Sequence, residues 1–190
     1  NNEHENCGFG FIANIKNQPK HEIVHQALEI VHNLDHRGAI GADPLAGDGA
    51  GILIQIPHEF FKQEFANTEI KLPNIGDYGV GMFFFPRETK YHALIKSLIV
   101  NSSKEQGIKF LGWRDIPVNN ECLSKEIEIS ESEPSHVQGF FERPKSMKED
   151  DFERNLYILR KKMTNRIYTE LGTEDLYYAV SLSSRTVVYK

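Results

Sequence analysis

The alternation of apolar and polar residues along the chain predicts a mixture of short strands and amphipathic helices. A period of two favours a strand because successive side chains point to opposite faces, whereas apolar residues three and four apart favour a helix. Strands are expected at residues 8–15, 52–56, 78–85, 109–113, 136–142, 176–182 and 185–189, and helices at 21–34, 91–99 and 152–167. The run 78–85 is apolar at nearly every position, which is typical of a strand buried on both faces.

The order of these elements indicates the fold class. Strands and helices do not alternate regularly, so we predict an α+β fold with antiparallel sheets rather than a doubly wound parallel one. Residues 37–51 are rich in Gly and Asp and are expected to form turns, and the polar stretch 121–134 is expected to be a surface excursion. The length of 190 residues fits one domain or a piece of a larger one.

Composition excludes several classes of protein. The formal net charge of -5 and the lack of a basic stripe argue against nucleic-acid binding, and no apolar run is long enough for a membrane span. The polar, acidic start resembles neither a secretory signal nor a transit peptide. Two cysteines, Cys7 and Cys122, are too few for a disulfide framework or an iron–sulfur cluster. We therefore expect a reducing, cytoplasmic location.

Cys7 is the candidate nucleophile. It lies close to the start of the chain and directly before Gly8, which allows other backbone to approach. If residues 1–6 are removed, the α-amino group of Cys7 lies next to its own sulfur. A free α-amino group has a pKa of about 7.7–8.0, so it can accept the thiol proton near working pH. The remaining thiol, Cys122, is expected to be incidental.

Three runs around and after this cysteine form one pattern. They are Cys7-Gly-Phe-Gly-Phe-Ile-Ala13, His36-Arg-Gly-Ala39 and Gly47-Asp-Gly-Ala-Gly-Ile-Leu53. The pattern resembles the class II glutamine amidotransferases and, within that class, the large subunit of glutamate synthase. Later motifs agree and extend the resemblance over nearly the whole chain: Gly112–Val118, Phe152–Lys161 and Ser181–Lys190.

The resemblance implies a fold, a reaction and partners. The fold would be of the N-terminal-nucleophile hydrolase type, with antiparallel sheets sandwiched between helix layers, incomplete in this chain. The reaction would release ammonia from glutamine through a cysteinyl thioester, for transfer to 2-oxoglutarate. The full-length enzyme would carry FMN and an iron–sulfur cluster, with no cofactor in this chain. Its partners would be the remaining synthase domains and a small electron-transfer subunit.

The resemblance also implies roles for individual residues. Cys7 and Arg37 would be catalytic, and Arg37 and Gly38 would contact the substrate; no metal is expected in the site. A fixed guanidinium near the thiol stabilises negative charge. An arginine that only holds the Gly-rich loop in place remains an alternative. Asp48 is expected to build a turn rather than to contact substrate.

Two departures from the family pattern affect the prediction. Residues 1–6 are interpreted as a leader, and residues 7–190 as the N-terminal part of the amidotransferase domain. While the leader is attached, the α-amine is part of an amide, so the uncut chain is expected to be inactive. The family's carboxylate-binding arginine segment and its oxyanion-hole Asn-Gly pair would follow Lys190. The chain is therefore identified as an enzyme of this type, while the activity of this chain alone is left open.

Two other functions remain open alternatives. The first is a catalytically inactive remnant that packs on a partner. The second is a zinc peptidase, because His21-Glu-Ile-Val-His25 matches His-Glu-x-x-His on a predicted helix. The residues beyond His25 do not supply the expected third ligand. The helical angle also places His21, His25 and His32 opposite the apolar stripe, so a solvent-facing surface or fortuitous metal binding is favoured. A dinucleotide loop at residues 47–51 is disfavoured because no helix follows it.

Overall fold

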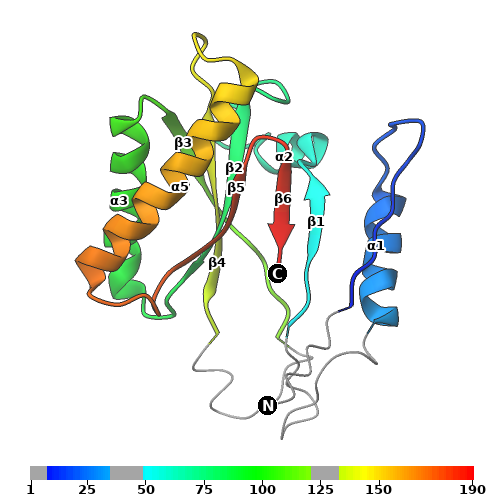
Figure 1. Ribbon diagram of the computed structural model, residues 1–190, viewed down its shortest axis with the longest axis horizontal. Coiled ribbons are helices and arrows are strands. Elements are labelled where there is room, and N and C mark those ends of the chain that lie inside the picture. The colour runs from blue at the N-terminus through cyan, green and yellow to red at the C-terminus, as the bar shows by residue number, and fades with distance from the viewer. Residues whose placement is uncertain (1–7, 35–48, 121–132) are drawn as a thin grey trace, which may run out of the picture.

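The computed structural model describes residues 8–34, 49–120 and 133–190 and places two antiparallel sheets between layers of helix (Figure 1). The four-stranded sheet has the order β3-β4-β2-β5, and the two-stranded sheet pairs β1 with β6. The strands are β1 (Ile52–Gln55), β2 (Tyr78–Phe85), β3 (Lys109–Asp115), β4 (Ser135–Glu142), β5 (Tyr178–Ser183) and β6 (Thr186–Tyr189). The helices are α1 (His21–Asn33), α2 (His58–Glu64), the short 3-10 helix η2 (Thr89–Tyr91), α3 (His92–Glu105) and α5 (Glu149–Leu171).

Strand β2 lies at the centre of the molecule and is buried on both faces, as predicted. Because side chains alternate along a strand, Phe83 and Phe85 belong to the core shared with α3 and α5. Val80 and Met82 belong to a second core, shared with α2 and the two-stranded sheet. The four-stranded sheet therefore separates two hydrophobic cores.

Helix α5 is held on the sheet by a stripe of fully buried side chains. Acidic residues in its first turn suit the positive end of the helix dipole, and Gly172, with φ of 71°, ends it in the left-handed conformation. A Cβ at Gly79 of β2 would lie 2.6 Å from the Leu156 side chain, so this glycine lets the helix approach the sheet closely. The buried stripe consists of Phe152, Leu156, Leu159, Met163 and Ile167.

A tight turn between β5 and β6 carries the chain from one sheet to the other. The backbone N–H and the hydroxyl of Ser184 both donate to Glu153 Oε2, at 2.8 and 2.6 Å. The backbone N–H of Ile56, just after β1, donates to the carbonyl of Arg185 at 3.1 Å. One carboxylate on α5 therefore holds the point at which the two sheets are joined.

The structure confirms most predicted elements and corrects one. The predicted strand at 8–15 is wrong, because these residues are not in a strand and Phe9, Phe11 and Ile15 are 87%, 82% and 101% exposed. The segment instead runs beside α1 (Figure 1), where a Cβ at Gly10 would lie 2.4 Å from Ile30 Cγ2. Its alternating glycines allow contact with a helix rather than pairing in a sheet.

One helix was not predicted, and two predicted segments lie outside the described residues. Helix α2 was not predicted, because it has seven residues and only Phe61 is buried. The α+β class with antiparallel sheets is confirmed. The turns expected from residue 37 and the excursion expected from residue 121 fall largely on 35–48 and 121–132, outside the described residues.

Candidate active site

The predicted site residues lie outside the part of the chain that the structure describes. This applies to Cys7, Arg37 and Gly38, and also to Asp48 and Cys122. The geometry of the site can therefore be followed only through the described residues beside them. Those neighbours are the start of the segment at Gly8, the end of α1, and the backbone that enters β1.

Gly8 packs directly on the end of α1. A Cβ on this glycine would lie 3.0 Å from Cδ2 of Leu34, closer than nearly all real contacts of this kind. Glycine suits such an approach because it has no side chain, whereas a Cβ would displace the Leu34 side chain by a few tenths of an ångström. The backbone that immediately follows Cys7 is thereby in contact with the residue that stands three positions before Arg37. A long-range contact therefore joins the start of the first family motif to the residue two positions before the second.

The Gly-rich motif enters β1 through a second close approach. Gly49 has φ of 98°, in the left-handed region that favours glycine. A Cβ on Gly51 would lie 2.8 Å from the carbonyl oxygen of Tyr189, where β6 pairs with β1. In Figure 1 the start of β1, the end of β6 and the end of α1 lie toward the same side of the molecule. In the described part of this motif, the glycines serve a turn and a close strand contact.

A buried polar network links the end of β6 to the four-stranded sheet. Gln138 of β4 is fully buried, and its Nε2 donates to the hydroxyl of Tyr189 at 3.1 Å. Its Oε1 accepts from Arg114 Nη1 at 3.2 Å. The same guanidinium donates twice to Glu64 Oε2, at 2.8 and 2.6 Å, and is only 11% exposed. Both functions of the Gln138 amide are satisfied, so the network fixes Tyr189 relative to the four-stranded sheet.

Sequence reasoning did not identify this network. Arg114 lies within a motif that carries the resemblance, but nothing in the pattern indicates that it pairs with α2. Gln138 is a lone polar residue in a predicted strand, and its partners come from two other strands. A polar residue between apolar neighbours in such a strand is the only signal that could have pointed to it.

A second buried polar contact lies beside α2. The Tyr78 hydroxyl and His58 Nδ1 form a hydrogen bond of 3.1 Å. Burial, with a smaller contribution from the nearby Glu59 charge, raises the pKa of Tyr78 well above its ordinary value. The phenol therefore stays protonated over the whole physiological range. It can orient the imidazole but cannot act as a base.

The zinc-peptidase alternative is not supported by the described residues. His21 and His25 lie on the exposed face of α1, as the helical angle predicted. Across residues 8–34, 49–120 and 133–190, no group of three His, Cys, Asp or Glu side chains could hold a metal ion. A catalytic zinc needs three protein ligands, so this histidine pair cannot form such a centre with described neighbours.

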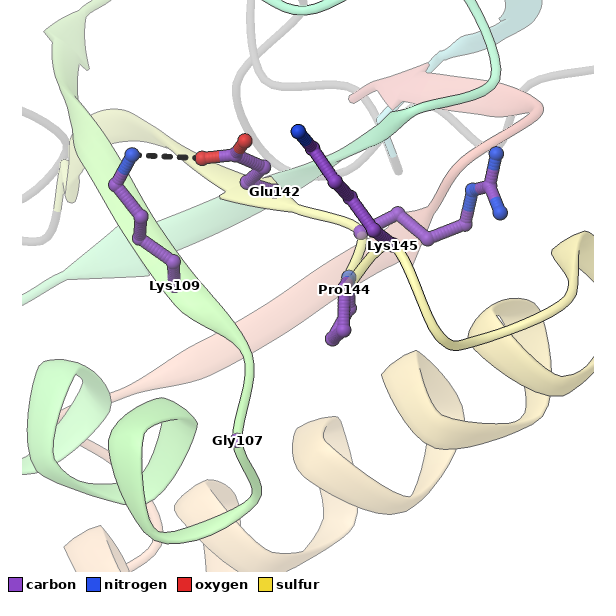
Figure 2. Close-up of a pocket in the computed structure, with 6 residues that line it drawn as sticks. Gly107, Lys109, Glu142, Pro144 and Lys145 are labelled. Carbon is purple, nitrogen blue, oxygen red and sulfur yellow. Dashed lines mark hydrogen bonds and ion pairs between the residues drawn. The ribbon is translucent and has the colours of Figure 1, made fainter.

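The pocket in Figure 2 is not the predicted site. It is a shallow hollow of about 220 Å³ between the start of β3 and the end of β4. Lys109 and Glu142 form an ion pair of 2.7 Å across it, so part of its charge is already neutralised. None of the predicted site residues lines it.

No helix in the described ranges is long and apolar enough to cross a membrane.

Sequence comparisons with a family model and with known proteins agree on one enzyme family. The sequence model of the family described as glutamine amidotransferases class-II matches residues 7–190. The chain is 42% identical over 190 residues to the glutamate synthase [NADPH] large chain of Bacillus subtilis, covering 99% of this chain and 12% of the relative. It is 38% identical over 189 residues to the ferredoxin-dependent glutamate synthase 1 of Arabidopsis thaliana, covering 97% and 11%. For the glutamate synthase [NADH] of Saccharomyces cerevisiae the identity is 36% over 197 residues, covering 99% and 9%. The chain therefore spans about a tenth of the length of these relatives.

Proposed function

Since the chain belongs to the class II glutamine amidotransferases, we propose that it is part of the glutaminase domain of a glutamate synthase, with Cys7 as the nucleophile. The observation that carries the proposal is the family match that begins at Cys7, together with the packing of Gly8 on Leu34. This contact supports a site in which the Cys7 segment and the Arg37 segment meet. The order of layers in Figure 1, helices outside two antiparallel sheets, supports an N-terminal-nucleophile type of fold.

The proposed reaction uses groups of this chain for its first steps. After residues 1–6 are removed, the α-amine of Cys7 takes the thiol proton, and the sulfur attacks the side-chain amide carbon of glutamine. The carbon–nitrogen bond breaks, and the proton leaves with the nitrogen as ammonia. Water then hydrolyses the thioester and releases glutamate. Arg37 stabilises the negative charge near the sulfur, and Gly38 lets the substrate approach the backbone.

Transfer of the ammonia to 2-oxoglutarate would take place in other domains of a longer protein. An iron–sulfur cluster needs several thiolates, usually four, and this sequence has two cysteines, so its residues do not fit the cluster. The cluster is therefore assigned to parts outside this chain, together with the FMN and the electron-transfer subunit that the resemblance implies. A reducing compartment such as the cytoplasm suits a nucleophilic thiol.

The proposal is tested with a diazoketone analogue of glutamine, which alkylates a nucleophilic thiol held next to a glutamine site. Intact-mass measurement and peptide mapping are expected to show one adduct, on Cys7, in protein whose chain starts at Cys7. Excess glutamine should slow this labelling. Cys122→Ser is the matched control and should label as the wild type does, whereas Cys7→Ser should not label. Equal labelling of both cysteines, unaffected by glutamine, would contradict the proposal and favour the inactive remnant.

A further inference from the structure

Helix α1 carries two histidines whose rings lie against one another on its exposed face. His21 and His25 stand one turn apart, and their ring centres are 4.5 Å apart with the ring planes at 88°. Both residues are exposed. The proposed glutaminase reaction does not use either of them, and the peptidase alternative fails for lack of a third ligand.

The spacing of the ring centres, which is that of an edge-to-face contact, also allows two imidazoles to bind one metal ion. The metal lies about 2.0–2.1 Å from each imidazole nitrogen, so two rings on one ion have centres about 4.5–5.3 Å apart for bond angles between a right angle and the tetrahedral angle. The observed 4.5 Å lies at the lower end of this range. We propose that His21 and His25 form a two-ligand binding site for a divalent transition-metal ion, with water in the remaining positions.

The chemistry of the ligands selects the class of ion. Neutral imidazole suits Zn²⁺, Ni²⁺ and Cu²⁺, whereas Mg²⁺ and Ca²⁺ prefer oxygen ligands. Glu22 and Glu29 lie on the same helix and offset the positive charge of Lys20 and of the helix N-terminus, so the affinity comes from the two imidazoles. The affinity should follow the general order for nitrogen ligands, with Cu²⁺ above Ni²⁺ and Ni²⁺ above Co²⁺.

Binding has a local structural consequence because α1 is weakly held. No residue of this helix is buried, and its N-cap residue, Lys20, makes no side-chain capping hydrogen bond. An ion shared by His21 and His25 bridges the first two turns, so any opening that separates these residues must also release the metal. The site is therefore a clamp on the start of α1, independent of the glutaminase chemistry.

The test is a titration of the 190-residue chain with Ni²⁺, with both cysteine thiols alkylated so that they cannot bind the ion. Calorimetry is expected to show a binding event that disappears in His21→Ala and in His25→Ala. Hydrogen exchange of α1 amides should slow by up to about 100-fold at a free-metal concentration 100 times Kd. His32→Ala is the matched control, since it is an exposed histidine on the same helix, and should bind as the wild type does.

Far-UV circular dichroism should show that each variant is folded before it is titrated. Binding that persists unchanged in His21→Ala or in His25→Ala would overturn the proposal. Equal loss of binding in His32→Ala would overturn it too, since the ion would then not belong to the pair. Binding of Ni²⁺ without any slowing of exchange in α1 would show that the ion is not held between two turns of this helix, with the same consequence.

Discussion

Helices α5 and α1 flank the two sheets from opposite sides (Figure 1), and both show an apolar stripe in the sequence. Five side chains of α5 are fully buried against the four-stranded sheet, whereas no residue of α1 is buried. The difference lies in the layer beneath each helix. A sheet of four strands, with α3 beside it, offers α5 a wide apolar surface, while α1 faces a sheet of two short strands. Amphipathic periodicity thus predicts a helix but does not predict how deeply it is buried.

The comparison also bears on the proposed site. The described residues nearest in sequence to Cys7 and Arg37, namely Gly8 and Leu34, belong to the thinly packed α1 side. The side of α5 is densely packed, and the α1 side would carry the proposed chemistry. Such a division is common, because sites are often built from segments positioned by a more stable framework.

The largest expected effect comes from truncating a leucine on each helix. Leu156→Ala on α5 removes a fully buried side chain and should lower the free energy of unfolding by about 2.7–5 kcal/mol. Leu28→Ala on α1 changes a residue that is 48% exposed and should cost less than about 1 kcal/mol. Urea denaturation of the two variants measures both values. Equal losses would contradict the contrast between the two helices.

The next effect concerns the polar network that joins the two sheets. Gln138→Leu keeps the volume of the side chain but leaves Arg114 Nη1 and the Tyr189 hydroxyl without this partner, at a cost of about 1–3 kcal/mol. Gln55→Leu is the matched control on β1, where the glutamine is exposed, and should change stability by less than about 0.5 kcal/mol. The difference in stability between the two variants is measured as the shift in denaturation midpoint, at an unchanged m value. A stabilising Gln138→Leu would show that the network does not hold the sheets together.

Alkaline pH should lower the free energy of unfolding because of the buried phenol of Tyr177. Burial raises the pKa of Tyr177, which is 2% exposed, above its ordinary value of 10.0. Above about pH 10 the unfolded chain releases this proton and the folded chain keeps it, so the free energy of unfolding falls as pH rises. The slope from this one phenol is at most about 1.4 kcal/mol per pH unit. Tyr177→Phe should reduce the slope measured between pH 9 and 11. An unchanged slope would show that other groups cause the dependence of the unfolding free energy on pH.

The smallest effect on global stability is expected on the α1 side. Gly10→Ala places a Cβ 2.4 Å from Ile30 Cγ2, so the segment before α1 must shift away from the helix. Because little apolar surface is buried there, the free energy of unfolding should change by less than about 0.5 kcal/mol. Hydrogen exchange near Ile30 should nevertheless become faster. A large global loss would mean that this segment contributes more to the fold than its exposure indicates.

The elements that were predicted correctly have a clear local pattern of apolar residues in the sequence. β2 is continuously apolar, and α5 repeats large apolar residues at spacings of three and four, so tertiary packing agrees with the local pattern. The segment 8–15 failed because the alternation of Phe with Gly looks the same whether the glycines face a strand or a helix. Helix α2 was not predicted because its seven residues are too few to show a helical period of apolar positions.

The candidate site could be predicted only in part. Cys7, Arg37 and Gly38 follow from motifs and stay predictions, since they lie outside the described residues. The contact between Gly8 and Leu34 could not be read from either residue, because it depends on how the chain returns along α1. The pairing of Gln138 with Arg114 and Tyr189 brings together residues 24 and 51 positions apart, and no local pattern encodes such a separation.

The bond from Ser184 to Glu153 has a mechanical consequence. Since the chain changes sheets at this turn and the carboxylate on α5 grips it through two donors, the sheets cannot slide past one another without breaking that grip. A pull on the end of β6 would be resisted by its pairing with β1 and then by this turn, through which part of the load would reach α5. Glu153→Gln would soften this linkage while leaving both cores intact.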